Sequence, residues 1–136
     1  MAYTTSEGKR RQTRESVLSK IAQRARFSSS GRSMYAVGSV QVHTRYCAGT
    51  GKYKFNINPN TLRADYELWI CGSEEDWYLV PIRVIRAMYD HPNAYPDRLH
   101  PEIRVVSVDT SDHSAIYASP SIKQDLRPYH RAVLTV

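Results

Sequence analysis

Alternating apolar and polar residues constrain the fold of this chain more than any other feature of its sequence. Over 40–45 the run Val-Gln-Val-His-Thr-Arg predicts a β-strand with one apolar face and one polar face. A glycine turn at 48–51 precedes the same alternation over 53–58, which predicts a second strand returning beside the first as a hairpin. We therefore expect residues 39–83 to build a curved sheet with one polar, basic face.

The remaining patterns complete an α+β prediction, the broad α/β class with helices packed on a sheet. Further strands are expected at 34–37, 66–71, 77–80, 103–108 and 114–118. A helix is expected over 13–27 with Thr13 as its N-cap, and a proline opens a middle helix over 82–89. A C-terminal helix should begin at Ser119 or Ser121. The predicted architecture is a central mixed, mostly antiparallel sheet flanked by these three helices.

Length and composition indicate one folded domain. A chain of 136 residues with 41% hydrophobic residues can form a single core of ordinary size. Residues 1–12 are expected to be a flexible basic tail, and residues 13–136 to be the domain. The two cysteines, Cys47 and Cys71, are too few for a disulfide framework and are expected to be free thiols. No segment has the length and apolarity of a membrane span or signal peptide, which predicts a cytoplasmic or otherwise intracellular protein.

The net charge of +6 is divided unevenly along the chain. Residues 1–63 contain twelve Lys or Arg and two acids, a balance of 12 − 2 = +10, whereas residues 64–136 contain seven basic residues and eleven acids, or 7 − 11 = −4. A surface that concentrates cations suits a polyanion, and nucleic acid is the commonest such partner. We expect DNA in preference to RNA, no membrane, and a second copy of this chain if the target is palindromic.

Several basic side chains are candidate phosphate contacts, because Lys and Arg position a protein on a nucleic acid without reading its sequence. These candidates are Arg10, Arg11, Arg14, Arg24, Arg32, Arg45, Lys52, Lys54 and Arg63. If the sheet face is the contact surface, exchanging Lys52 and Lys54 for glutamate should abolish most DNA affinity. Scattered basic residues usually only make a surface soluble, but the acid-free run over 16–64 argues against that alternative here.

The order of these elements resembles the PD-(D/E)XK nuclease superfamily. The resemblance is carried by VQVHT at 40–44, KYKF at 52–55, ADYELWI at 64–70 and WYLVPI at 77–82, and it covers roughly residues 15–82. Within the superfamily the chain looks most like the homing-endonuclease-like proteins associated with group I introns. This resemblance implies a restriction-endonuclease-like core. It also implies cleavage of DNA with Mg²⁺ held by acidic or amide oxygens beside a lysine.

Transferred residue by residue, the resemblance implies a degenerate active site. Gln41 matches a metal ligand, Glu15 matches a helix glutamate that serves as an additional ligand, and His43 stands where the family has lysine. The catalytic candidates are therefore Glu15, Gln41 and His43, and the candidate Mg²⁺ ligands are Glu15 and Gln41. No Asp or Glu occurs between Glu15 and Asp65, so the family's aspartate has no counterpart.

Three functions remain open on the sequence alone. The first is a DNA-binding protein on a nuclease-like scaffold with a degenerate active site and no cofactor. The second is an active Mg²⁺-dependent DNA endonuclease that takes its acids from Glu15, Asp65 and Glu67. The third is a non-catalytic module whose acidic second half binds another protein. Absence of nicking with Mg²⁺ or Mn²⁺ would reject the second, and a steep salt dependence of DNA binding would separate the first from the third.

Overall fold

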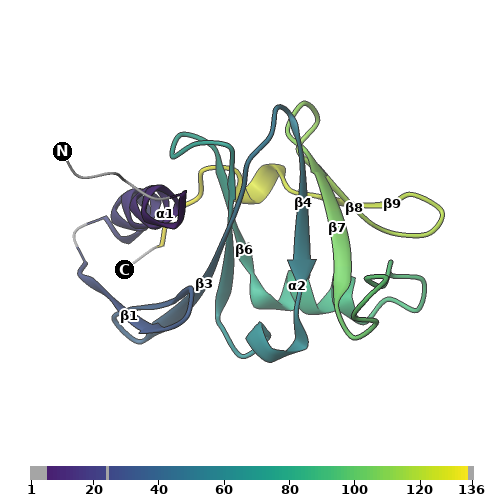
Figure 1. The fold of residues 1–136 in the computed structure, drawn as a ribbon, viewed down its shortest axis with the longest axis horizontal. Coiled ribbons are helices and arrows are strands. Elements are labelled where there is room, and N and C mark those ends of the chain that lie inside the picture. The colour runs from purple at the N-terminus through teal and green to yellow at the C-terminus, as the bar shows by residue number, and fades with distance from the viewer. Residues whose placement is uncertain (1–5, 24, 135–136) are drawn as a thin grey trace.

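The computed structural model describes residues 6–23 and 25–134, and it has three layers, with helix α1 on one sheet and a second sheet on the other side (Figure 1). The helices are α1 (Ser6–Ala22) and α2 (Ile82–Tyr89). Sheet A contains β1 (Phe27–Gly31), β2 (Met34–Val37), β3 (Val40–Cys47), β5 (Tyr66–Cys71) and β6 (Trp77–Pro81). Sheet B contains β4 (Lys52–Ile57), β7 (Arg104–Asp109), β8 (Ser114–Ala118) and β9 (Ile122–Asp125). The α+β class predicted from the sequence is confirmed.

Helix α1 is displaced toward the N-terminus relative to its prediction. The Thr13 hydroxyl donates a hydrogen bond to the carbonyl oxygen of Lys9, so Thr13 lies inside the helix and is not its N-cap. Residues 6–12, expected to belong to a flexible tail, are its first turns. The helix ends at Ala22 because Gln23 has a φ of 57°, outside the right-handed helical region. The run 28–31, expected to be a loop, is part of β1.

Sheet A is mixed, with the order β1-β2-β3-β5-β6. Its central pair, β3 and β5, is parallel, and Cys47 lies opposite Cys71 in the register. Both thiols are free, as expected, and burial raises the pKa of Cys71. From Glu67 to Cys71 every residue of β5 is buried, as is typical of a strand covered on both faces.

The predicted hairpin between β3 and β4 is wrong. The chain leaves sheet A after β3, and β4 pairs antiparallel with β7 in sheet B. The strand order of sheet B is β4-β7-β8-β9. Strand β4 is buried on alternate residues only, so its apolar face needs one covering layer, and it lies at the edge of the outer sheet. Strand β3 has buried residues on both faces and takes the interior position beside β5. A single curved sheet with one basic face is therefore not formed.

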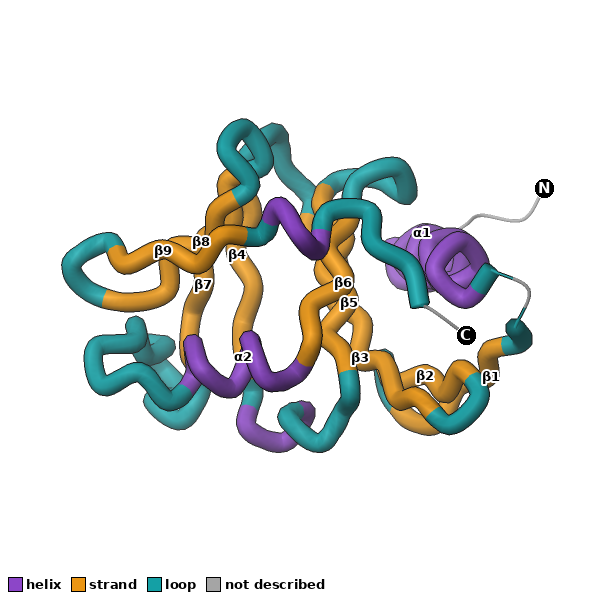
Figure 2. Tube along the Cα trace, turned by 180° about the vertical axis from the view of Figure 1, so that it is seen from behind, coloured by secondary structure: helices purple, strands orange, loops and turns teal. Residues whose placement is uncertain are grey.

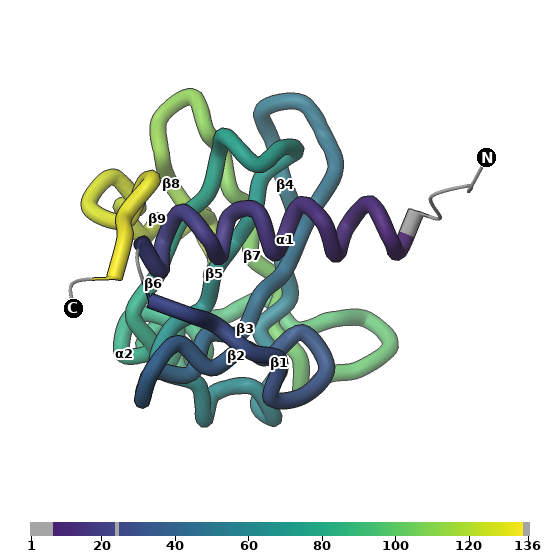
Figure 3. Tube along the Cα trace, turned by 90° about the vertical axis from the view of Figure 1, so that its left-hand side faces the viewer, coloured from purple at the N-terminus to yellow at the C-terminus, as the bar shows by residue number. Residues whose placement is uncertain are grey.

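Two apolar cores join the three layers. The first joins α1 to sheet A and includes Leu18, Ile21, Val42 and Leu68. Figure 3 shows α1 crossing the strands of sheet A, with the β1–β2 hairpin beside it. The second core joins the inner faces of the two sheets, and α2 closes one end of it with Ile85 and Met88 (Figure 2). Its members come from both sheets, from α2 and from the residues that flank the short 3₁₀ turns Pro59–Thr61 and Arg127–Tyr129: Tyr53, Phe55, Ile57, Leu62, Trp69, Cys71, Tyr78, Val80, Ile85, Met88, Val106, Val108, Ala115 and Leu126.

The prediction of a C-terminal helix is also wrong, whereas α2 has the bounds that were predicted for it. Residues 122–125 alternate between half-buried and exposed, which is the period of a strand, and they form β9 against β8. The chain then makes the short 3₁₀ turn η2 (Arg127–Tyr129), since Pro128 cannot continue a helix from a preceding turn. Neither helix in the described ranges has both the length and the apolar character needed to cross a membrane.

Candidate functional site

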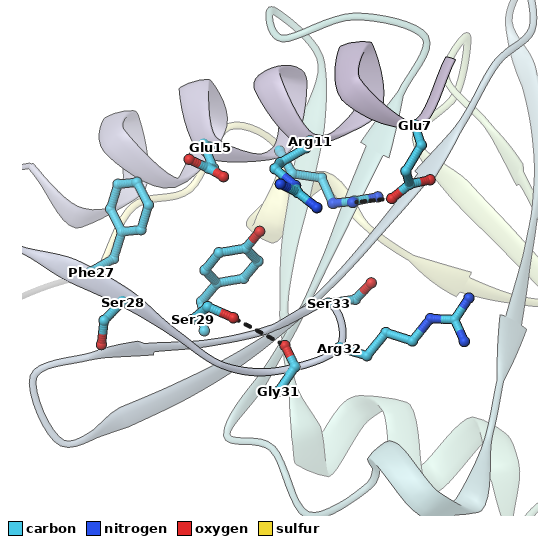
Figure 4. A pocket seen from close by; sticks show the side chains of 11 residues that line it. Glu7, Arg11, Glu15, Phe27, Ser28, Ser29, Gly31, Arg32 and Ser33 are labelled. Atoms are coloured by element: carbon cyan, nitrogen blue, oxygen red, sulfur yellow. Dashed lines mark hydrogen bonds and ion pairs between the residues drawn. The ribbon is translucent and has the colours of Figure 1, made fainter. Parts of the chain in front are cut away.

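A groove with a volume of about 470 Å³ separates α1 from the β1–β2 hairpin (Figure 4). We call it the helix–hairpin groove. It is lined by Glu7, Arg11, Arg14 and Glu15 of α1, by Phe27, Ser28, Ser29 and Gly31 of β1, by Arg32 and Ser33 of the turn, and by Tyr35 of β2. The groove exists because α1 packs on sheet A through Val17, Leu18 and Ile21, while β1 lies at the open edge of that sheet.

Three guanidinium groups from two elements line this groove. Arg11 and Arg14 belong to α1, and Arg32 belongs to the hairpin turn. Arg14 makes an ion pair of 3.1 Å with Glu7, and its hydrogen bond lowers the pKa of the Glu7 carboxyl. Within the described residues the guanidinium groups of Arg11 and Arg32 make no ion pair or hydrogen bond, although the charge of Arg11 also helps to lower the pKa of Glu7. Two exposed cations are therefore available to a ligand.

The two ends of the groove differ in chemistry. Figure 4 shows Phe27 and Glu15 toward one end and Glu7 and Arg32 toward the other. The Phe27 ring contacts Tyr35 edge to face, with ring centroids 6.0 Å apart and planes at 73°. Phe27 is half-buried, packs against the core between α1 and sheet A, and also lines the groove. One end of the groove thus carries Arg32 and the Glu7–Arg14 ion pair, and the other carries the Phe27 ring and the Glu15 carboxylate.

A second concave surface lies where α1 meets the end of β3. It is lined by Lys9, Arg10, Thr13, Tyr46 and Ala48 and has a volume of about 210 Å³. Together with the groove it brings five cations to the N-terminal half of α1 and its neighbours, Lys9, Arg10, Arg11, Arg14 and Arg32. The nearby carboxylates are those of Glu7 and Glu15, so the local balance is 5 − 2 = +3.

His43 and Glu67 form a buried pair on the face of sheet A opposite α1. The Nδ1 atom of His43 lies 2.9 Å and 3.1 Å from the two carboxylate oxygens of Glu67, and the side chains are 6% and 1% exposed. The Thr61 hydroxyl donates a third hydrogen bond, of 3.2 Å, to the same carboxylate. Because β3 and β5 place His43 and Glu67 opposite each other, the pair links the two central strands of the sheet.

Gln41 lies on the same face, beside a separate pocket of about 280 Å³ lined by Ser30, Met34, Gln41 and Arg63. Its Oε1 accepts a hydrogen bond of 2.8 Å from the Ser30 hydroxyl. Its backbone N–H donates to a carboxylate oxygen of Asp65, also at 2.8 Å. Asp65 therefore fixes the entry to β5 and does not point at His43 or Glu15 as a further acidic ligand.

The metal ligands suggested by the sequence do not come together. Gln41 and His43 alternate with Val42, whose side chain packs against α1, so they point to the other face of the sheet. Glu15 lies on α1 and lines the helix–hairpin groove. Sheet A therefore separates Glu15 from the other two. Within residues 6–23 and 25–134, no group of three or more His, Cys, Asp or Glu side chains is arranged to hold a metal ion.

The basic side chains expected on one sheet face are dispersed. Lys52 and Lys54 lie on the outer face of sheet B, because Tyr53 and Phe55 turn inward to the core. Arg45 is half-buried on the inner face of sheet A, and its Nε atom is buried without a hydrogen-bond partner in the described structure. Arg63 lines the pocket beside Gln41. Arg24 lies outside the described residues.

Sequence reasoning missed the aromatic end of the groove. Phe27 was expected to end a helix, and Ser28 and Ser29 to form a loop, so none of them was a candidate contact. The available signal was the turn sequence Gly31-Arg32-Ser33 directly before the apolar run 34–37, which is compatible with a tight hairpin. Glu67 was considered as an acid for the active-nuclease alternative or as a local ion-pair partner beside a basic sheet, but His43 was not identified as its partner.

Comparison of this chain with models of protein families, with curated proteins and with solved structures finds no match.

Proposed function

We propose that this protein binds nucleic acid, with DNA favoured, through the helix–hairpin groove and the cationic N-terminal half of α1. The observation that carries this proposal is the convergence of Arg11, Arg14 and Arg32, from two separate elements, on one groove. Arginine is suited to phosphate because its planar guanidinium presents several donors in a fixed geometry. A location inside the cell, where nucleic acid is present, is part of this proposal.

Charge in the first turns of α1 supports the same conclusion. The N-terminus of a helix has a partial positive charge, which disfavours cations and favours anions nearby. Lys9, Arg10 and Arg11 nevertheless follow closely after the first residue of the helix. A bound phosphate chain would neutralise both the side chains and the helix end. Glu7 in the first turn and Lys20 in the last turn suit the helix dipole, so it is the cluster of cations at 9–11 that favours a polyanion.

We further propose that the scaffold is nuclease-like and that its active site is degenerate. The mixed sheet with a parallel central pair, covered by α1 on one face, supports this proposal, whereas KYKF at 52–55, one of the segments that carry the resemblance, lies in sheet B. At the position of the family's lysine, His43 is buried in its pair with Glu67. This arrangement supports a structural use of residues that the resemblance associates with catalysis.

Two double charge reversals test which basic surface binds. Arg11→Glu/Arg32→Glu alters the groove, and Lys52→Glu/Lys54→Glu alters the outer face of sheet B with the same change in net charge and comparably exposed side chains. Binding of a fluorescent duplex is measured by anisotropy at several salt concentrations. The groove variant should bind the duplex at least about tenfold more weakly. The plot of log affinity against log salt should become less steep, with the magnitude of its slope smaller by about 2.

The lysine variant is the matched control and should retain most of the wild-type affinity. Loss of binding in the lysine variant but not in the groove variant would move the contact surface to sheet B. A wild-type protein that binds neither duplex nor single strand at low salt would contradict the proposed function.

A further inference from the structure

The helix–hairpin groove has the chemistry of an unpaired nucleotide rather than of a duplex, and this inference rests on the proposed function. We propose that it selects single-stranded nucleic acid, with the phosphates at Arg11 and Arg32 and one base stacked on Phe27. A nucleotide has an anionic part and an aromatic part, and the groove presents cations and an aromatic ring side by side along its length.

The dimensions of the groove favour a single strand. Its volume of about 470 Å³ lies in the range of roughly 300–1,000 Å³ that holds one small organic ligand. It is enclosed by one helix and a hairpin of two short strands, β1 and β2. A duplex can place only its backbone against such a surface, whereas an unpaired nucleotide can enter it.

Phe27 supplies a stacking surface that a paired base cannot reach. In a duplex both faces of each base are covered by neighbouring bases, so an aromatic side chain stacks only on bases that are already unstacked. Tyr35 is buried, and its edge-to-face contact holds the Phe27 ring in place before a ligand arrives. An ordered ring loses little conformational freedom on binding, which favours stacking.

The hydroxyl groups of the groove do not select one base. Ser28 and Ser33 carry hydroxyl groups that both donate and accept hydrogen bonds. Ser29 already donates a hydrogen bond of 3.2 Å to the carbonyl oxygen of Gly31. Hydroxyl groups of this kind accept any base edge, so stacking and phosphate contacts dominate. The groove should therefore tolerate different sequences.

The test compares one oligonucleotide of about 12 nucleotides, a length within the usual site sizes, as a single strand and as a duplex. The wild-type protein should bind the single strand at least about tenfold more tightly than the duplex. Phe27→Ala should weaken single-strand binding by about 5- to 150-fold, the effect of losing one stacked base, and should leave duplex binding unchanged.

Phe27→Trp is the conservative control, and it adds a spectroscopic readout. Phe27→Trp should retain the single-strand affinity of the wild-type protein. The fluorescence of its new indole ring should be quenched when the single strand binds but not when the duplex binds. The native Trp69 and Trp77 are buried and give a constant background. If Phe27→Ala proves unstable in a thermal melt, the wild-type preference and the Phe27→Trp quenching decide the question.

The outcomes separate the two proposals. Equal affinity for single strand and duplex, or a Phe27→Ala variant that weakens both equally, would overturn the single-strand inference while the proposed function stands. Binding of neither probe by the wild-type protein would overturn the proposed function itself. A wild-type preference for the single strand, together with quenching in Phe27→Trp, supports both.

Discussion

At the scale of single residues, the contact between His43 and Glu67 has consequences for stability. It is the one ion-pairing contact, among those in the described ranges, in which both side chains are buried. Removing one member of a buried hydrogen-bonded pair leaves the other without a partner, and the loss of stability comes mainly from that orphaned group. The pair should therefore be sensitive to the kind of substitution made.

Glu67→Ala should lower the free energy of unfolding by about 2–4 kcal/mol, because it leaves the imidazole of His43 buried without an acceptor. Glu67→Gln keeps an acceptor oxygen and should lose less than half as much. Urea denaturation measures both variants, with Glu74→Ala as a control whose exposed pair with Lys20 should contribute at most about 1 kcal/mol. Equal losses of unfolding free energy in Glu67→Ala and Glu67→Gln would show that the hydrogen bond to His43 does not account for the stability of the pair.

At the scale of elements, the segment after η2 connects helix α1 to sheet A. The backbone N–H of Leu134 donates to the carbonyl oxygen of Ile21 in α1, and the indole N–H of Trp77 in β6 donates to the carbonyl oxygen of Ala132. The Leu134 side chain is buried among the residues that join α1 to the sheet. This segment therefore stabilises the attachment of the helix that forms one wall of the groove.

Leu134→Ala should reduce the free energy of unfolding by about 2–4 kcal/mol, because it removes buried methyl groups and leaves a cavity beside α1. The neighbouring residue offers a matched control, since Val133 is exposed. Val133→Ala should change stability by no more than about 0.5 kcal/mol. Thermal and urea denaturation measure both variants. Similar stabilities for the two would mean that the segment does not hold the helix.

Elements with strong local patterns were predicted well, and element ends were not. Strands β2, β5 and β8 and helix α2 have the bounds that periodicity and Pro81 indicate. The C-terminal segment was mistaken for a helix because Ile122 and Leu126 stand four residues apart, and the period of two appears only in the burial of residues 122–125 in the folded chain. Spacing alone does not decide between the two periods in so short a run.

At the scale of the whole molecule, the Tyr78 side chain connects the two sheets through a polar contact. Tyr78 of β6 in sheet A lies with its hydroxyl oxygen 2.7 Å from Nδ1 of His113, in the turn between β7 and β8 of sheet B. Burial of the phenol raises the pKa of Tyr78 above its ordinary value. The folded protein therefore holds this proton more tightly than the unfolded chain does.

The contribution of this proton to stability is complete below about pH 10, the unfolded pKa of tyrosine, and is lost as the pH rises toward the higher folded value. Wild-type protein should lose about 1 kcal/mol from this source by about pH 11. Tyr78→Phe should be less stable at neutral pH, because the hydrogen bond is gone, but should decline less between about pH 10 and pH 11. Urea denaturation across that range measures the difference. Parallel declines in the two proteins would contradict the assignment.

The pairing of distant strands decides which parts of the candidate site could be predicted from the sequence. The cations Arg11, Arg14 and Arg32 were candidates from composition, and the structure brings them to one groove. Their separation from Lys52 and Lys54 depends on β3 pairing with β5 rather than with β4, a contact between residues distant in sequence. No local pattern distinguishes those two pairings, because each satisfies the alternation of β3 equally well.

The route of the chain between β3 and β5 also bears on how the protein folds. After β3 the backbone crosses to sheet B, contributes β4, and returns through η1 (Pro59–Thr61) before β5 takes its place. The partner of β4 is β7, which is made only after β5, β6 and α2. Neither sheet is finished before the other has begun, so no cut in the chain would yield two self-sufficient halves. Such interleaving favours a single all-or-none folding transition, with a nucleus that draws on both ends of the sequence.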